Sequence, residues 1–241
     1  MIFVEVCQGV AYFRARSEKR AGGGTGGLKT GVFRYSKNDW LICLKTRGET
    51  LRKWKGRWDK VKEIQIHRTT LQFTVGDITA QDTDAVANAA NSALAPGGGV
   101  SGAIHRAAGK GLREECAGLG GCRTGEAKIT GGHRLPNRYV IHTVGPVYSG
   151  SADDPVLLRS CYINSLKVAD EHQVKSVAFP ALSTGIFGYP LKDAARVAIL
   201  AFRDYLSGDT GIELVRMVLY DQKAFTAHVE ALETLKHEGE L

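Results

Sequence analysis

The chain has 241 residues, of which 43% are hydrophobic and 24% are charged, and its formal net charge at pH 7 is +7. This length allows one large domain with a small appendage or two small domains, and the composition is ordinary for a soluble protein. No apolar run approaches the roughly 20 residues of a membrane span, and the opening residues lack the pattern of a secretion signal. We therefore expect a cytoplasmic protein with no membrane partner.

The basic excess lies entirely in the N-terminal part of the chain. Residues 1–70 hold 16 Lys and Arg against 6 Asp and Glu, whereas residues 71–241 hold 16 against 19. A glycine-rich break at residues 21–27 is followed by a predicted short strand at 40–44 and by a basic segment with Trp54 and Trp58. We interpret residues 1–67 as an extension that either binds nucleic acid through phosphate contacts and stacking or packs on the main domain through its tryptophans.

From residue 68 onward, strand and helix patterns alternate. Apolar or alternating sequence predicts strands at residues 71–75, 85–87, 139–146, 177–179 and 212–219. Helices are predicted at residues 103–108 with a continuation at 112–116, at 158–169, from Pro190 to Ser207, and after Asp221, which caps the last one. This alternation predicts a three-layer α/β/α domain over residues 68–241.

Two glycine-containing loops each follow an apolar strand and lead into a helix. The first includes Gly97, Gly98 and Gly99, and the second runs from Ser183 through Gly185 to a helix opened by Pro190. Backbone N–H groups in such loops, together with the positive end of a helix dipole, attract phosphate. Taken alone, the first loop is equally consistent with a turn that closes a βα unit. A second loop of the same design favours a pyrophosphate between the two.

Four motifs in this order resemble those of the macro domain family: Gly76-Asp77-Ile78, Asn88-Ala89-Ala90-Asn91, Gly97-Gly98-Gly99-Val100 and Ser183-Thr184-Gly185-Ile186-Phe187. The Rossmann pattern Gly-x-Gly-x-x-Gly is absent after the first strand. The resemblance covers residues 68–241. It implies an α/β/α fold around a mixed central sheet and a site for ADP-ribose or an ADP-ribosylated protein.

The resemblance also implies a role for each motif residue. Asp77 and Ile78 are expected to hold the adenine, although Asp77 is also suited to capping a helix. The backbones of Gly98, Gly99 and Val100 and of Ser183, Thr184, Gly185 and Ile186 are expected to hold the pyrophosphate. Asn91 and Phe187 are expected to frame the distal ribose. Ala89, within the second motif, and Gly102, two residues after the third, complete the expected ligand-binding set.

For catalysis, the residue after the Gly-Gly-Gly-Val run is informative. In MacroD-type hydrolases it is an aspartate, and here it is Ser101, which cannot act as a carboxylate base. Activity would then rest on Asn91 and a water held by the ligand's pyrophosphate, with Ser101 beside them; His105, one turn later, is an alternative base. Two functions stay open: a hydrolase acting on mono-ADP-ribosylated acidic residues or on O-acetyl-ADP-ribose, and a reader that binds ADP-ribose without turnover.

No cofactor is expected for either function. The five cysteines are widely spaced and form no C-x-x-C pair, which predicts neither a disulfide framework nor a zinc site. Hydrolysis of an ester needs only a directed water and stabilisation of the developing negative charge. The sequence therefore predicts a metal-free site.

Overall fold

The computed structural model describes residues 61–241 throughout and, before them, the backbone of residues 2–7, 10–15, 30–32, 41–42 and 54–55. Residues 1–58 and 59–241 form two compact units. In the first unit, β1 (Ile2–Cys7), β2 (Val10–Ala15) and β3 (Thr30–Val32) form an antiparallel sheet, and β4 (Leu41–Ile42) pairs with β5 (Trp54–Lys55). The nucleic-acid prediction concerns side chains of this unit, which lie outside the described residues.

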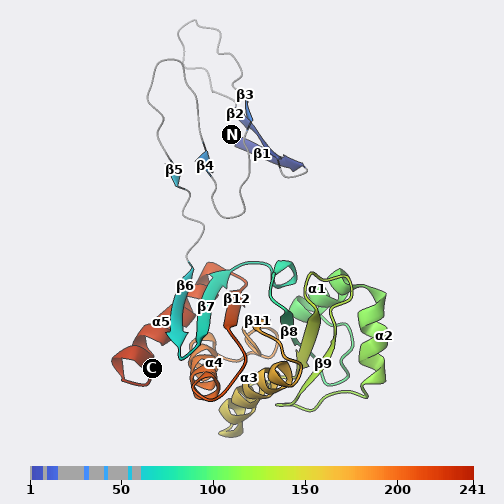
Figure 1. Ribbon diagram of the computed structural model, residues 1–241, viewed down its shortest axis with the longest axis vertical. Coiled ribbons are helices and arrows are strands. Elements are labelled where there is room, and N and C mark those ends of the chain that lie inside the picture. The colour runs from blue at the N-terminus through green and yellow to red at the C-terminus, as the bar shows by residue number, and fades with distance from the viewer. Residues whose placement is uncertain (1, 8–9, 16–29, 33–40, 43–53, 56–60) are drawn as a thin grey trace, which may run out of the picture. The chain divides into compact units, whose positions relative to one another are not determined.

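The second unit is built on a mixed seven-stranded sheet in the order β6-β7-β12-β11-β8-β10-β9. Figure 1 labels β6, β7, β12, β11, β8 and β9 of this sheet from left to right. The five central strands are parallel, and the two edge strands, β6 and β9, are antiparallel to their neighbours. The bounds are β6 Lys62–Ile66, β7 Thr69–Val75, β8 Ala85–Ala89, β9 Ala127–Gly131, β10 Tyr139–Thr143, β11 Ser176–Phe179 and β12 Leu214–Leu219.

Helices cover both faces of this sheet. The helices are α1 (Gly99–Ala108), α2 (Lys110–Gly118), α3 (Asp153–Glu171), α4 (Leu191–Leu206) and α5 (Gln222–His237), with a short 3₁₀ turn, η1 (Ile78–Ala80). One hydrophobic core joins α3, α4 and α5 to one face, and a second core joins η1, α1 and α2 to the other. The predicted three-layer α/β/α architecture around a mixed sheet is therefore confirmed.

Local sequence signals account for many element boundaries. The Asp221 carboxylate accepts a hydrogen bond from Ala224 N at 2.8 Å and so caps α5, as predicted. Pro190 stands immediately before α4. Gly109 separates α1 from α2 with a φ of +83°, a conformation that favours glycine. Ala85, Val86 and Ala87 are fully buried because β8 lies between the two helical layers.

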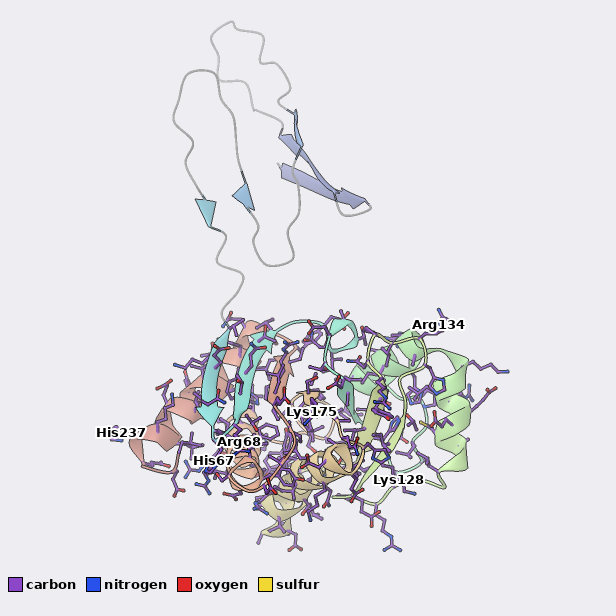
Figure 2. All side chains as sticks on the ribbon, viewed as in Figure 1. His67, Arg68, Lys128, Arg134, Lys175 and His237 are labelled. Carbon is purple, nitrogen blue, oxygen red and sulfur yellow. The ribbon has the colours of Figure 1, made fainter. Side chains whose placement is uncertain are left out.

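The N-terminal edge of the sheet changes the expected domain boundary. β6 precedes residue 68 and pairs antiparallel with β7 from Lys62↔Phe73 to Ile66↔Thr69. His67 and Arg68 form the turn between these strands, where Figure 2 labels them, and His67 has a φ of +51°. A boundary at 67/68 therefore cuts a hairpin, and the compact unit begins at Asp59 instead. The sequence reading missed β6 because only Ile64 and Ile66 show its alternation.

Two expectations from composition concern membranes and thiols. Within the described part of the chain, no helix has both the length and the apolarity to cross a membrane. Cys116, Cys122 and Cys161 are buried free thiols, and Cys7 and Cys43 have side chains outside the described residues.

Candidate functional site

The two glycine-containing loops emerge side by side from the sheet. They follow β8 and β11, which are adjacent parallel strands although about 90 residues separate them in the sequence. The segment after β7, with Asp77, lies on one side of these loops, and the segment after β10, with Gly145, lies on the other. Ligands of open α/β sheets bind at the carboxyl ends of such strands.

The first loop presents unused hydrogen-bond donors at the start of α1. Within residues 61–241, the backbone N–H groups of residues 98–101 have no hydrogen-bond acceptor. Gly98 is the N-cap of α1 and provides no side-chain cap. A Cβ added at Gly98 or Gly99 would meet no atom within 4 Å, so a ligand can approach this backbone closely. These donors, with the α1 dipole, form an anion-binding geometry.

Gly102 has a different role from the one expected. Its N–H already donates to Gly98 O at 3.3 Å. Gly102 is buried, and a Cβ added there would fall within contact distance of the Gly97 carbonyl oxygen. Gly102 therefore lets α1 pack closely beneath the loop and does not offer its amide to a ligand.

The second loop presents another row of donors. Within the described residues, the N–H groups of residues 183–187 have no acceptor. Hydrogen bonds from Tyr189 N to Ser183 O and from Gly188 N to Gly185 O, each 3.0 Å, close the loop. Ser183 has a φ of +62°, a strained conformation for a residue with a side chain. Ile186 is 94% exposed and Phe187 is half-buried.

The segment after β10 supports the second loop. Tyr148 N donates to Phe187 O at 2.8 Å. The Ser183 hydroxyl is buried, has no hydrogen-bond partner and lies against Gly145, where a Cβ would overlap it. Asp154 anchors the far end of the segment, because its carboxylate accepts hydrogen bonds from the backbone N–H groups of Ser149 and Gly150. The bond from Ser149, and then that from Gly150, lowers the pKa of this carboxyl group. The sequence reading did not identify this support, whose only sequence signal is Gly145-Pro146 at the end of a strand.

The segments that follow β8, β10 and β11 carry no charged side chain. Residues 85–104, 143–152 and 176–191 contain no Asp, Glu, Lys or Arg. Exposed Asp77, at the end of β7, is the charged group among the expected ligand-binding residues. An anion held between the two loops would therefore depend on backbone N–H groups and the helix dipole.

Asn91 and Asp77 both use their side chains within the protein. Asn91 Nδ2 donates to Ala95 O at 2.8 Å, and its Oδ1 accepts from Ala95 N at 3.0 Å. Asn91 thus shapes the loop that leads to Gly97. Asp77 Oδ1 accepts from the N–H and the hydroxyl of Thr79, each at 2.8 Å, so the capping role left open by the sequence is present. Ile78 is buried beneath α1 in the second core, and Ala89 ends β8.

Ser101 and His105 lie on the buried side of α1. The Ser101 hydroxyl lies near Gly97 and is buried without a hydrogen-bond partner. Both ring nitrogens of His105 are also buried without a hydrogen-bond partner. The His105 ring lies 6.4 Å from that of fully buried His142, and burial lowers its pKa. His105 therefore faces a polar cluster beneath α1, which argues against a role as the catalytic base.

That cluster is built around His142, on β10. Asn88 Nδ2 donates to His142 Nδ1 at 3.1 Å, and Thr130 Oγ1 lies 2.8 Å from Nε2. Burial, and then the proximity of His105, lowers the pKa of His142 to about 3. The cluster was not predicted, since its members come from β8, β9 and β10 and meet only in the folded sheet.

Comparison with known proteins agrees with this architecture. The family model described as Macro domain matches residues 87–198. The chain is 53% identical over 157 residues to macro domain-containing protein CT2219 of Chlorobaculum tepidum, covering 65% of this chain and 91% of that protein. It is 49% identical over 162 residues to ADP-ribose glycohydrolase MACROD1 of Bos taurus, covering 66% of this chain and 49% of that protein.

A solved structure shows the same fold. The Oceanobacillus iheyensis macrodomain with ADP superposes with a TM-score of 0.71 at 37% sequence identity, and the match covers 74% of this chain and 97% of that one. Two independent comparisons of sequence and one of structure thus agree with the motif order and the α/β/α layers. The chain belongs to the macro domain family.

Proposed function

We propose that this protein binds ADP-ribose and hydrolyses ADP-ribosyl esters. The observation that carries the proposal is the pair of adjacent loops, residues 98–101 and 183–187, whose N–H groups have no acceptor within the described residues. Two rows of donors suit the two phosphates of a pyrophosphate. Similarity to a protein named ADP-ribose glycohydrolase, and to a macrodomain solved with ADP, supports the same ligand.

The strand order gives the ligand a direction. With the pyrophosphate over β11 and β8, the adenine would lie toward β7, near Asp77 and Ile78. Oδ1 of Asp77 already accepts two hydrogen bonds from Thr79, so Oδ2 is the oxygen that would accept a hydrogen bond from the adenine amine. The distal ribose would then lie toward β10, near Asn91 and Phe187.

The proposed substrates are mono-ADP-ribosylated acidic side chains and O-acetyl-ADP-ribose. Both are esters of the distal ribose, and their hydrolysis needs a directed water and stabilisation of negative charge. The pyrophosphate, held by the backbone donors at the start of α1, would in turn hold the water, and the α1 dipole would stabilise the negative charge. Asn91 would orient the ribose or the water through the amide that also binds Ala95.

The second candidate is a reader that binds ADP-ribose without turnover. It is favoured by the residue after the Gly-Gly-Gly-Val run, because buried Ser101 supplies no carboxylate. Asn91 favours it too, because both the nitrogen and the oxygen of its side-chain amide already form hydrogen bonds with the backbone of Ala95. Incubation with a mono-ADP-ribosylated peptide, with detection of free ADP-ribose, separates the hydrolase from the reader.

Substitutions at Asn91 and Ser101 should separate orientation from acid-base chemistry. We expect Asn91→Ala to lower single-turnover release of ADP-ribose at least about tenfold. Asn91→Asp keeps an acceptor for Ala95 N and loses the donor. It should therefore preserve the conformation of the loop and still lower the rate of ADP-ribose release. Ser101→Ala should change the rate less than about threefold, because a hydroxyl is not a base at neutral pH. Ser101→Asp adds a carboxylate beside Gly97, and we expect a higher rate together with weaker binding, because its charge also repels the pyrophosphate.

Binding must be measured for each of these variants by calorimetry, since a loosened loop also lowers release. A rate that collapses in Ser101→Ala while binding persists would give the serine a direct role and contradict the proposal. If the unmodified protein binds ADP-ribose tightly and releases it from no ester, the function that remains is that of a reader.

Gly145 tests whether the second loop binds the ligand. We expect Gly145→Ala to weaken ADP-ribose binding about tenfold, because overpacking of this kind costs roughly 1–3 kcal/mol and displaces Ser183. The double variant Gly145→Ala/Ser183→Gly should recover binding to within about threefold, since it removes the overlapping hydroxyl and glycine suits the positive φ. Gly118→Ala is a matched control, because a Cβ there meets nothing within 4 Å.

Calorimetric titration with ADP-ribose measures all four proteins. Full affinity in Gly145→Ala, or a double variant as weak as the single one, would show that the Ser183 loop does not hold the ligand.

A further inference from the structure

Three large apolar side chains are exposed on the loops after β10 and β11, and we call them the apolar rim: Val147 (64% exposed), Tyr148 (39%) and Ile186 (94%). The two loops are tied together by the hydrogen bond from Tyr148 N to Phe187 O. The Tyr148 ring also packs on buried Tyr189, with ring centroids 4.9 Å apart. Tyr148 is thus held in place with part of its surface left open. Clustered exposed apolar groups beside a polar site mark a contact surface.

The strand order places this rim at one end of the proposed ligand. Asp77 follows β7, the glycine-containing loops follow β11 and β8, and Val147 and Tyr148 follow β10, which lies on the other side of β8. A ligand with its adenine near Asp77 and its pyrophosphate over the two loops therefore points its distal ribose toward the rim. A group esterified to that ribose would lie against Val147 and Tyr148.

The chemistry of the rim favours an uncharged aliphatic group. Residues 143–152 and 176–191 contain no charged side chain. The carboxylates that follow Tyr148 in the chain are exposed Asp153 and then Asp154, which is buried and accepts hydrogen bonds from Ser149 and Gly150. The residues of the rim itself carry no charge to pair with a peptide, whereas they offer apolar area to a hydrocarbon chain.

We propose that the apolar rim selects O-acyl-ADP-ribose whose acyl chain is longer than acetyl, with Val147 and Tyr148 as the residues that set this preference. The inference rests on the proposed function and names the substrate class of the same site. In the reaction, the oxygen of water bonds to the acyl carbonyl carbon, and the bond between that carbon and the ribose oxygen breaks. The ribose oxygen takes one proton of the water and becomes a hydroxyl, and the acid leaves as a carboxylate with the other proton released to solvent.

Each methylene that the rim removes from water should raise kcat/KM. Complete burial of a methylene corresponds to about fourfold, and a rim open on one side should provide about two- to threefold. We therefore expect kcat/KM to rise about four- to ninefold from acetyl- through propionyl- to butyryl-ADP-ribose. Val147→Ser and Tyr148→Ser should reduce the butyryl-to-acetyl ratio to below about twofold. Both substitutions keep the backbone N–H that Tyr148 donates to Phe187.

Val61→Ser is the matched control. Val61 is also an exposed valine, and it precedes β6. Four strands of the sheet lie between β6 and β10, so Val61 is far from the apolar rim. We expect this variant to keep the butyryl-to-acetyl ratio of the unmodified protein. Thermal unfolding of all variants tests that each remains folded.

The outcomes separate this inference from the function on which it rests. Release that is independent of chain length, that falls from acetyl to butyryl, or that is faster from a peptide carrying mono-ADP-ribosylated glutamate would overturn the acyl preference and leave the hydrolase in place. A ratio that stays high in both serine variants would overturn the assignment to Val147 and Tyr148. Binding of ADP-ribose with no release from any ester would overturn the proposed function and this inference with it.

Discussion

A chain that lacks residues 1–67 is expected to have a free energy of unfolding about 3–5 kcal/mol lower than a chain that lacks only residues 1–58. Ile66 is only 8% exposed and belongs to the core beneath α4 and α5, and Ile64 packs against the same core. Burial of one such isoleucine is worth roughly 1.5–3 kcal/mol. The longer deletion removes both and breaks the pairing of β6 with β7.

Urea denaturation of the two shortened chains and of the full chain measures this difference. The longer deletion also makes β7 an edge strand, so we expect it to aggregate more readily. Lys62→Ala serves as a control for charge, because the ion pair of Lys62 with Glu233 is exposed and such pairs are worth little. Equal stability of residues 59–241 and 68–241 would show that β6 is not part of the folded domain.

Acid is expected to destabilise the domain by an amount on the order of 5 kcal/mol between pH 7 and pH 4.5. Burial lowers the pKa of His142 to about 3 and that of His228 to about 4, from an ordinary value of 6.5. Below pH 6.5 the unfolded chain binds a proton on each histidine and the folded chain does not. The free energy of unfolding therefore falls by about 1.4 kcal/mol per pH unit for each histidine. Above pH 6.5 these two residues contribute no pH dependence.

His228 allows this origin to be tested. Its ring is fully buried on α5, with Nδ1 donating to Ala224 O at 2.8 Å and Nε2 without a partner. In His228→Leu, the change in the free energy of unfolding between pH 7 and 4.5 should be about half that of the unmodified protein. His237→Gln changes a histidine that is exposed on the same helix, where Figure 2 labels it, and should leave the change intact.

Urea midpoints at pH 7, 6, 5 and 4.5 provide the measurement. A domain with the same midpoint at pH 7 and 4.5 would contradict the burial of two neutral histidines. An unaltered pH dependence in His228→Leu would assign the effect to other groups.

The sequence by itself determined the elements whose signals are local. Pro190 before α4, Asp221 before α5 and the apolar β8 can be recognised because each depends on neighbouring residues alone. The two glycine-containing loops were recognisable for the same reason, since a strand, a loop rich in small residues and a helix follow one another in the chain. The order of four motifs then sufficed to predict the family and the three layers.

Only the tertiary structure decided how these parts meet. β11 pairs with β8 across about 90 residues, and this pairing brings the two rows of N–H donors together. Pairing between distant strands has no local signal, because any apolar strand can satisfy the backbone of another. The same reason explains why β6, with two alternating isoleucines, became visible only as the partner of β7.

Side-chain roles within the site were also decided by packing. Gly102 has the residue type expected of a ligand contact, yet its N–H is already used and its Cα packs against Gly97. His105 lies one turn after Ser101 but faces the buried His142, because the apolar positions of α1 turn that side of the helix toward the sheet. Helical spacing gives which residues share a face, and only the fold determines whether that face meets the ligand or the core.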